Sequence, residues 1–164
     1  MDANTIKEYV SEGKKREEEF RQLFPGKEII VASDEEDMKE HWDLKIEGVK
    51  IDVKGLKKVQ RSDEQVEQHI HWLEIKNVKG ETGWCYGQAD AFAFEIQDYW
   101  IIVKKEALQN YIKENIVKRL TKTPALYYLY RRKSRLDLIT PVTSYDLCFI
   151  AKKMVKKPRQ NVAQ

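Results

Sequence analysis

Hydrophobic residues recur at helical spacing near the N-terminus and alternate with polar residues along much of the chain that follows. A stripe formed by Phe20, Leu23 and Phe24 predicts a helix over residues 5–24, and Pro25-Gly26 is a signal for its end. Alternation and turn residues predict the other segments in this order: a strand at 28–32, an acidic loop at 34–40, strands at 41–46 and 49–54, a polar loop at 56–68, a strand at 69–76, a glycine-rich connection at 77–88, strands at 89–96 and 99–103, a helix at 105–120, strands at 126–132 and 135–140, and a helix at 144–156. This order indicates an α/β or α+β domain around a mixed sheet.

The hairpin predicted around Glu47-Gly48 is the most informative segment. Counting back from this turn places Asp43 directly opposite Asp52, with Trp42 on the apolar face of the first strand. A shift of one residue would turn apolar side chains to the wrong face, so the pattern supports this pairing. Opposed side chains have Cβ atoms about 5 Å apart, where like charges are destabilising. A divalent cation between the two carboxylates would remove that repulsion, and Mg²⁺ favours such a site.

Lys54 follows Asp52 by two residues and is therefore expected on the same face of the strand. An ammonium group there can position a water molecule and stabilise negative charge on a phosphate. The tripeptide Asp-x-Lys is common by chance, and the Asp43 predicted across the hairpin makes the pattern more specific. A surface hairpin with scattered charges is the alternative.

Asp43 followed by Ile51-Asp52-Val53-Lys54 resembles the PD-(D/E)XK nuclease superfamily, which includes restriction endonucleases, archaeal Holliday junction resolvases and many phage nucleases. Its signature is an acidic residue on one strand and Asp/Glu-x-Lys on the next, preceded by a helix that carries a Glu. Glu17 matches that helix, since apolar residues follow it at the third and seventh positions. The segment 71–95 is similar to small phage-type members, and the first motif has Trp42 in place of the Pro in the superfamily's name.

The resemblance implies a restriction endonuclease-like mixed sheet flanked by helices and a metal-dependent deoxyribonuclease activity. Mg²⁺, for which Mn²⁺ would substitute, would be held by Asp43, Asp52 and the Val53 carbonyl. Lys54 would assist the attacking water. Glu17 would complete the site or bind a second ion.

A shifted assignment stays open, with Asp52 as the first acid and Glu74-Ile75-Lys76 as the Glu-x-Lys element. If the hairpin holds the site instead, Glu74 and Lys76 are expected on the neighbouring strand, supporting the site or binding substrate. Asp90 follows the glycine-rich connection and is either close to the metal or part of an ordinary turn.

Charge is distributed unevenly along the 164 residues, which are expected to form one domain over 1–157 and a loose basic tail at 158–164. The first half has an excess of carboxylates and the second half an excess of cations. An acidic cluster beside a basic surface fits a metal site next to a phosphate-binding surface, although ordinary solvated surface explains the charge alone. The candidate DNA phosphate contacts are Arg131, Arg132, Lys133 and Arg135.

Several classes of protein are excluded by what the sequence lacks. Cys85 and Cys148 have no metal or redox spacing and suit a reducing cytosol. No signal peptide, membrane span or nucleotide-binding glycine motif is recognised, so we expect a cytoplasmic protein, in the host cytoplasm if phage-encoded, with no membrane partner and no nucleotide cofactor. A homodimer is expected if the protein makes paired cuts in DNA. The alternative function is a non-catalytic nucleic-acid-binding or protein-interaction domain that keeps the fold.

Overall fold

The computed structural model describes residues 3–57 and 69–159, and this part of the chain is a mixed α+β protein, as predicted. Its helices are α1 (Ala3–Arg21), α2 (Asp34–Glu40), α3 (Lys105–Asn115) and α4 (Ser144–Phe149), with a 3₁₀ helix η1 (Trp84–Tyr86). Its strands are β1 (Ile29–Val31), β2 (Leu44–Ile46), β3 (Val49–Lys54), β4 (Ile70–Lys76), β5 (Ala91–Glu95), β6 (Tyr99–Lys104), β7 (Val117–Thr121), β8 (Tyr128–Tyr130), β9 (Leu138–Thr143) and β10 (Lys153–Lys156). Within the described ranges, no helix is long and apolar enough to cross a bilayer.

The strands form two sheets. The larger sheet has the order β1-β2-β3-β5-β6-β10, in which only β3 and β5 run parallel. The smaller sheet has the order β4-β9-β8-β7, in which β7 and β8 run parallel. The strands at the centre of the larger sheet are nearly continuous apolar runs, as is typical of strands covered on both faces.

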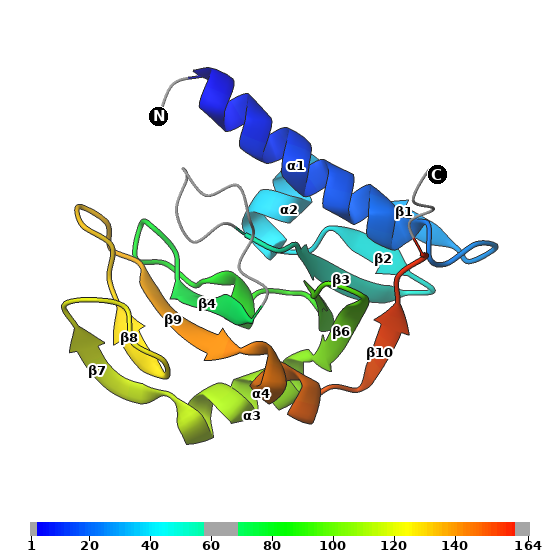
Figure 1. The fold of residues 1–164 in the computed structure, drawn as a ribbon. Coiled ribbons are helices and arrows are strands. Elements are labelled where there is room, and N and C mark those ends of the chain that lie inside the picture. The colour runs from blue at the N-terminus through cyan, green and yellow to red at the C-terminus, as the bar shows by residue number, and fades with distance from the viewer. Residues whose placement is uncertain (1–2, 58–68, 160–164) are drawn as a thin grey trace, which may run out of the picture.

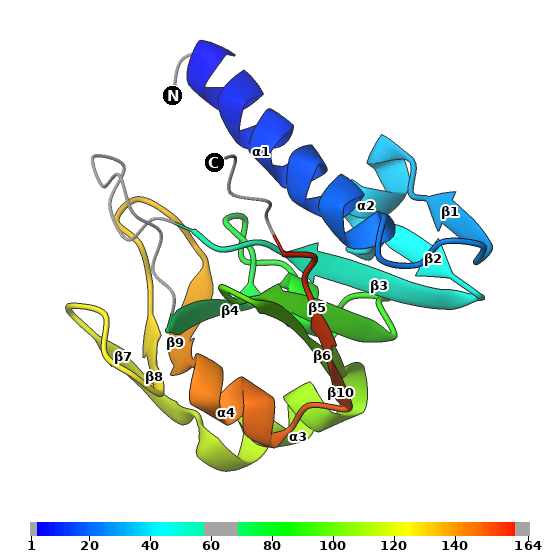
Figure 2. The same ribbon diagram turned by 45° about the vertical axis from the view of Figure 1, so that its right-hand side comes forward.

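Each face of the larger sheet has its own core. On one face, Phe20 of α1 packs against Leu44 and Trp100. On the other face, Phe92 and Leu108 belong to a core shared with α3, α4 and the smaller sheet. Figures 1 and 2 show α1 on one side of the larger sheet and α3 and α4 on the opposite side.

The predicted hairpin is confirmed, with Ile46 paired to Val49 across a turn of two residues. The expected place of Trp42 is wrong, because its side chain joins the core of Phe92, on the face opposite to Leu44. His41, which ends α2, has a left-handed backbone with φ 59°, and β2 begins only at Leu44. Strand alternation therefore does not extend back to Trp42.

The acidic segment 34–40 is the helix α2 rather than a loop. Ser33 accepts a hydrogen bond from the Glu36 N–H, and the Glu36 carboxylate accepts one from the Ser33 N–H. This capping box stabilises the start of a helix that buries none of its residues. The spacing of Ser33 and Glu36 is a capping signal that could have predicted this helix from the sequence.

Two predicted helices are shorter than expected. The helix at 105–120 ends at Asn115 and is followed by β7, and the helix at 144–156 ends at Phe149 and is followed by β10. Both new strands pair with other segments of the chain, β7 with the nearby β8 and β10 with the distant β6, and local periodicity does not reveal such pairing. The other predicted strands are present, while residues 58–68 of the polar loop and 160–164 of the tail lie outside the described residues.

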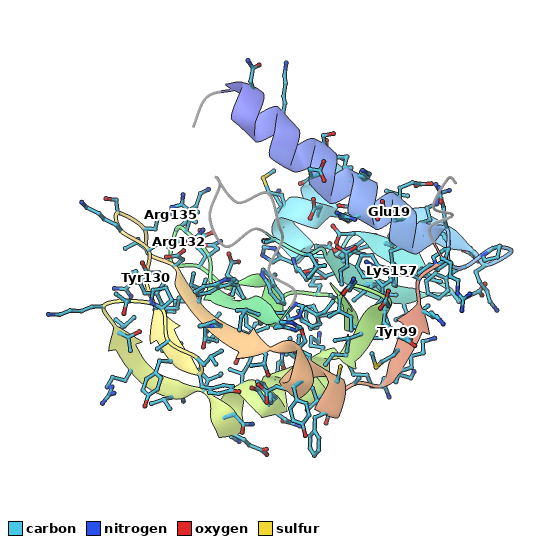
Figure 3. All side chains as sticks on the ribbon, in the orientation of Figure 1. Glu19, Tyr99, Tyr130, Arg132, Arg135 and Lys157 are labelled. Atoms are coloured by element: carbon cyan, nitrogen blue, oxygen red, sulfur yellow. The ribbon has the colours of Figure 1, made fainter. Side chains whose placement is uncertain are left out.

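Glu95 is buried at the end of β5, with only 1% of its surface exposed. Its carboxylate accepts hydrogen bonds from Arg16 Nη1 at 3.3 Å, from Lys157 Nζ at 2.7 Å and from the Leu56 N–H at 2.9 Å. Arg16 also bonds Glu19 at 3.0 Å, and Figure 3 shows Glu19 and Lys157 where α1 and the C-terminal segment meet. One carboxylate therefore joins α1, the chain after β3 and the chain after β10.

We expect Glu95→Ala to lower the free energy of unfolding by about 3 kcal/mol, because it leaves two cations around a buried site without their anion. Glu19→Ala is the matched control, since Glu19 pairs with the same Arg16 at the exposed surface and should contribute less than about 1 kcal/mol. Urea denaturation measures both. Equal losses in the two variants would show that burial of Glu95 has no special role.

Candidate active site

Asp43 and Asp52 face each other at the end of the hairpin, as expected. The register that pairs Leu44 with Ile51 places Asp43 level with Asp52 one step further from the turn. The Val53 N–H donates to Asp43 Oδ2 at 2.6 Å and holds that side chain against β3. Only 8% of Asp43 and 3% of Asp52 is exposed.

The ammonium group of Lys54 lies beside the carboxylate of Asp52. Its Nζ lies 2.7 Å from Asp52 Oδ1 and 4.4 Å from the centre of the Trp84 ring. Trp84 packs in turn against Phe92, so the face of the indole forms one wall beside the lysine. The ammonium is held between a carboxylate and an aromatic ring rather than extended into solvent.

Burial and mutual repulsion shift the pKa values of these groups. Burial, followed by the charge of Asp52, raises the pKa of Asp43 to about 8. Burial also raises the pKa of Asp52, which Lys54 opposes. Burial would lower the pKa of Lys54, but the carboxylates of Asp52 and Asp43 outweigh it and raise that pKa. Near neutral pH the metal-free site therefore holds a protonated Asp43 and a cationic Lys54.

Glu17 of α1 lies within electrostatic range of the hairpin. Burial, then the charges of Asp43 and Asp37, raises the pKa of Glu17 to about 7, while Lys14 and Lys54 oppose that rise. Asp37 of α2 also raises the pKa of Asp43 and Asp52. Sequence reasoning missed Asp37, because the segment that carries it was expected to be a loop.

The donor set fits a hard divalent cation. When both carboxyls are ionised, Asp52 Oδ2 is a buried oxygen that receives no hydrogen bond from any described residue. The described residues contain no group of three or more His, Cys, Asp or Glu side chains arranged to hold a metal. Mg²⁺ accepts two carboxylate ligands when water and phosphate oxygens complete its coordination shell.

Glu74 and Lys76 are not on a strand that neighbours the hairpin, so that expectation is wrong. The neighbours of β3 are β2 and β5, whereas β4 pairs with β9 in the smaller sheet. Glu74 Oε1 accepts from the Trp84 N–H at 3.4 Å, and Lys76 is exposed beyond a β-bulge. The geometry favours the assignment with Asp43, because that residue meets Asp52 directly and Lys54 already supplies the ammonium group.

Asp90 connects β3 to the start of β5. Its Oδ2 accepts from the Lys50 N–H at 2.9 Å, and its own N–H donates to the Lys50 carbonyl at 2.8 Å. Its side chain is exposed and is engaged at the end of β3 that lies away from Lys54. These contacts are those of a residue that braces two strands.

Arg132 of the predicted basic cluster has a buried carboxylate partner. Its Nε donates to Asp137 Oδ2 at 2.5 Å and its N–H to Asp137 Oδ1 at 3.1 Å, and Asp137 is fully buried. Figure 3 shows Arg132 and Arg135 together at one end of the smaller sheet. Arg131 and Lys133 are exposed. The orientation of the Arg132 guanidinium is therefore set by a buried partner.

Lys57 links this cluster to the hairpin. It interacts electrostatically with Lys54, Asp52, Glu74 and Arg132. Sequence reasoning missed it, although it lies three residues after Lys54 in a basic run. One lysine therefore interacts with both the Asp52 carboxylate of the larger sheet and the Arg132 guanidinium that follows β8.

In comparisons with known proteins, no family model, no curated protein and no solved structure matches this chain. The functional argument therefore depends on the geometry of the site.

We expect Asp43→Asn to stabilise the metal-free protein as the pH rises. A carboxyl whose pKa is raised by folding contributes stability below its unfolded pKa, and this stability is lost as the pH rises through the folded value of about 8. The free energy of unfolding of Asp43→Asn should equal that of the wild type at about pH 4 and exceed it by at least about 1 kcal/mol near pH 7.5. Thermal melts in EDTA across this range measure it.

The matched control is Asp34→Asn, at a side chain that is 95% exposed, which should show no such trend. Adding Mg²⁺ at about pH 7.5 should raise the melting temperatures of the wild type and of Asp34→Asn. The melting temperature of Asp43→Asn should rise much less. Equal Mg²⁺ shifts in all three proteins would exclude a metal site at Asp43.

Proposed function

We propose that this protein is a Mg²⁺-dependent nuclease of the PD-(D/E)XK type that hydrolyses DNA phosphodiester bonds. The observation that carries the proposal is the pair of buried, opposed carboxylates of Asp43 and Asp52 with the Lys54 ammonium 2.7 Å from Asp52. A helix bearing Glu17 before the hairpin is the further element that the superfamily signature asks for. The family and the activity are proposed together, since they depend on the same residues.

The energetics of the pair support a functional reading over a non-catalytic one. Two like charges held together in a low-dielectric environment destabilise the folded chain unless one is protonated or a cation binds. Replacing Asp43 by an apolar or amide residue would remove that penalty at once. A domain that only bound DNA would have no use for the opposed pair.

The roles follow from the positions of the groups. Asp43 and Asp52, with the Val53 carbonyl by resemblance, would hold Mg²⁺, and Mn²⁺ would substitute. When bound, the ion would neutralise charge on the scissile phosphate and supply an activated water.

Lys54 and Glu17 contribute charge and proton transfer. Since the pKa of Lys54 is raised, its side chain stays an ammonium group and stabilises the negative charge that develops on the phosphate. The pKa of about 7 at Glu17 suits a carboxylate that accepts a proton near neutral pH. The electrostatic contact between Glu17 and both Asp43 and Lys54 supports this role.

DNA is the proposed substrate because the cationic side chains of Lys54 and Lys57 interact with the Asp52 carboxylate and a basic cluster follows β8. Arg132 is oriented by a buried aspartate, and Lys57 interacts electrostatically with both Arg132 and Asp52. Arginine and lysine at such positions contact phosphates and orient the backbone without reading its sequence. The exposed Arg131, Lys133 and the half-buried Arg135 extend this surface.

Cleavage should require Mg²⁺ or Mn²⁺, and EDTA should abolish it, because two carboxylates without a cation offer no charge neutralisation to a phosphate. The assay incubates the purified protein with duplex, single-stranded and branched DNA in each condition. Asp52→Asn should lower the rate at least about 100-fold, the scale of one lost electrostatic stabiliser, while Asp34→Asn should match the wild type. Cleavage that persists in EDTA would exclude the proposed mechanism.

Lys54→Met should lower the cleavage rate by about 100- to 1,000-fold with little change in DNA affinity, because the ammonium acts on charge that develops in the transition state. Lys50→Met is the matched control on the same strand, where the ammonium pairs with Glu40 at 3.1 Å. Single-turnover cleavage and binding in EDTA separate the two effects. A loss of affinity equal to the loss of rate would assign Lys54 to substrate binding alone.

A further inference from the structure

The smaller sheet presents a row of aromatic side chains on its outer face. Leu73 and Leu129 pack into the core, so their neighbours in sequence, Trp72, Tyr128 and Tyr130, lie on the opposite face. The rings of Trp72 and Tyr130 have centroids 6.4 Å apart across strands β4 and β8. All three side chains are half-buried, so each keeps part of its surface accessible.

Cations accompany these rings. The Arg119 guanidinium of β7 lies 5.1 Å from the centre of the Tyr128 ring. Arg132 follows Tyr130 by two residues and is held by buried Asp137. Between Glu114 and Asp137 the chain has no acidic residue and carries these cations: Lys118, Arg119, Lys122, Arg131, Arg132, Lys133 and Arg135.

The aromatic face and the candidate active site share an electrostatic neighbour, Lys57. Ile139 pairs with both Tyr130 and Glu74, so Glu74 lies on the same face as the rings. Lys57 interacts electrostatically with Glu74 and Arg132 and also with Asp52. Lys57 therefore connects the charged surroundings of the aromatic face with those of the carboxylates.

We propose that Trp72, Tyr128 and Tyr130, with Arg119 and Arg132, form a binding platform for an unpaired DNA strand, whose bases stack on the rings while the arginines contact its phosphates. The inference rests on the proposed function and names its substrate class: DNA with a single-stranded segment. Aromatic rings with neighbouring cations are the arrangement that binds single strands without sequence preference. The paired bases of a duplex have no free faces for the rings.

The test measures binding of fluorescent oligo(dT) and of a blunt duplex of equal length, in EDTA so that no cleavage interferes. Tyr130→Leu and Trp72→Leu keep apolar bulk but remove the ring, and each should weaken oligo(dT) binding by about 5- to 150-fold, the scale of one lost base-stacking contact. Duplex binding should change less than twofold. Tyr130→Phe, which keeps the ring, should bind oligo(dT) like the wild type.

Tyr145→Leu is the matched control, since Tyr145 of α4 is 79% exposed and lies on another element. Its oligo(dT) affinity should equal that of the wild type. Leucine variants that bind oligo(dT) normally, or that lose oligo(dT) and duplex by the same factor, would overturn the platform.

A second measurement needs no variant and therefore does not depend on folding of the mutants. Wild-type protein is crosslinked by light to an oligonucleotide that contains 5-bromodeoxyuridine, and the attachment site is identified by mass spectrometry. Attachment at Trp72, Tyr128 or Tyr130 supports the platform, and attachment only elsewhere overturns it. Failure of the nuclease proposal is distinguishable, because it would appear as no cleavage in Mg²⁺ while these EDTA binding results stood unchanged.

Discussion

The buried carboxylate of Glu95 is the interaction on which the position of the candidate site depends. The carboxylate accepts a hydrogen bond from Arg16, which precedes Glu17 on α1. It also accepts one from the N–H of Leu56, two residues after Lys54. Gly55 lets these parts approach, since a Cβ there would lie 2.8 Å from Arg16 Cγ. This ionic contact in the interior, together with the packing of Phe20 on Leu44 and Trp100, therefore fixes the helix that carries Glu17 against the strand that carries Asp52 and Lys54.

A second constraint follows from the two faces of β3. Ile51 packs under α1, whereas Asp52 and Lys54 project toward the side where Trp84 and Phe92 lie. Asp52 is buried and Lys54 lies over the Trp84 ring with about a quarter of its side chain exposed, so solvent screens their mutual interaction less than it would at an open surface. Because burial raises the pKa of both Asp43 and Asp52, the net charge of the site depends on whether these carboxyls are protonated.

The sequence was sufficient to predict what depends on local periodicity, and insufficient for what depends on distant pairing. The hairpin and the opposition of Asp43 to Asp52 were predictable, because a two-residue turn and a period of two allow one register. The place of Glu74 was not predictable, since β4 alternates equally well in either sheet, and its partner β9 lies more than 60 residues later. Nor was the burial of Glu95 predictable, because its partners Arg16 and Lys157 come from the two ends of the chain.

The protonated state of Asp43 connects these constraints to the proposed chemistry. In the metal-free protein the ion pair of Asp52 and Lys54 is balanced, and Asp43 avoids adding a second negative charge by keeping its proton. In the proposed nuclease, Asp43 must lose that proton before both carboxylates can hold a divalent cation, so affinity for the cation would rise with pH. The burial that raises the pKa of Asp43 would therefore couple cation binding to proton release in the proposed nuclease.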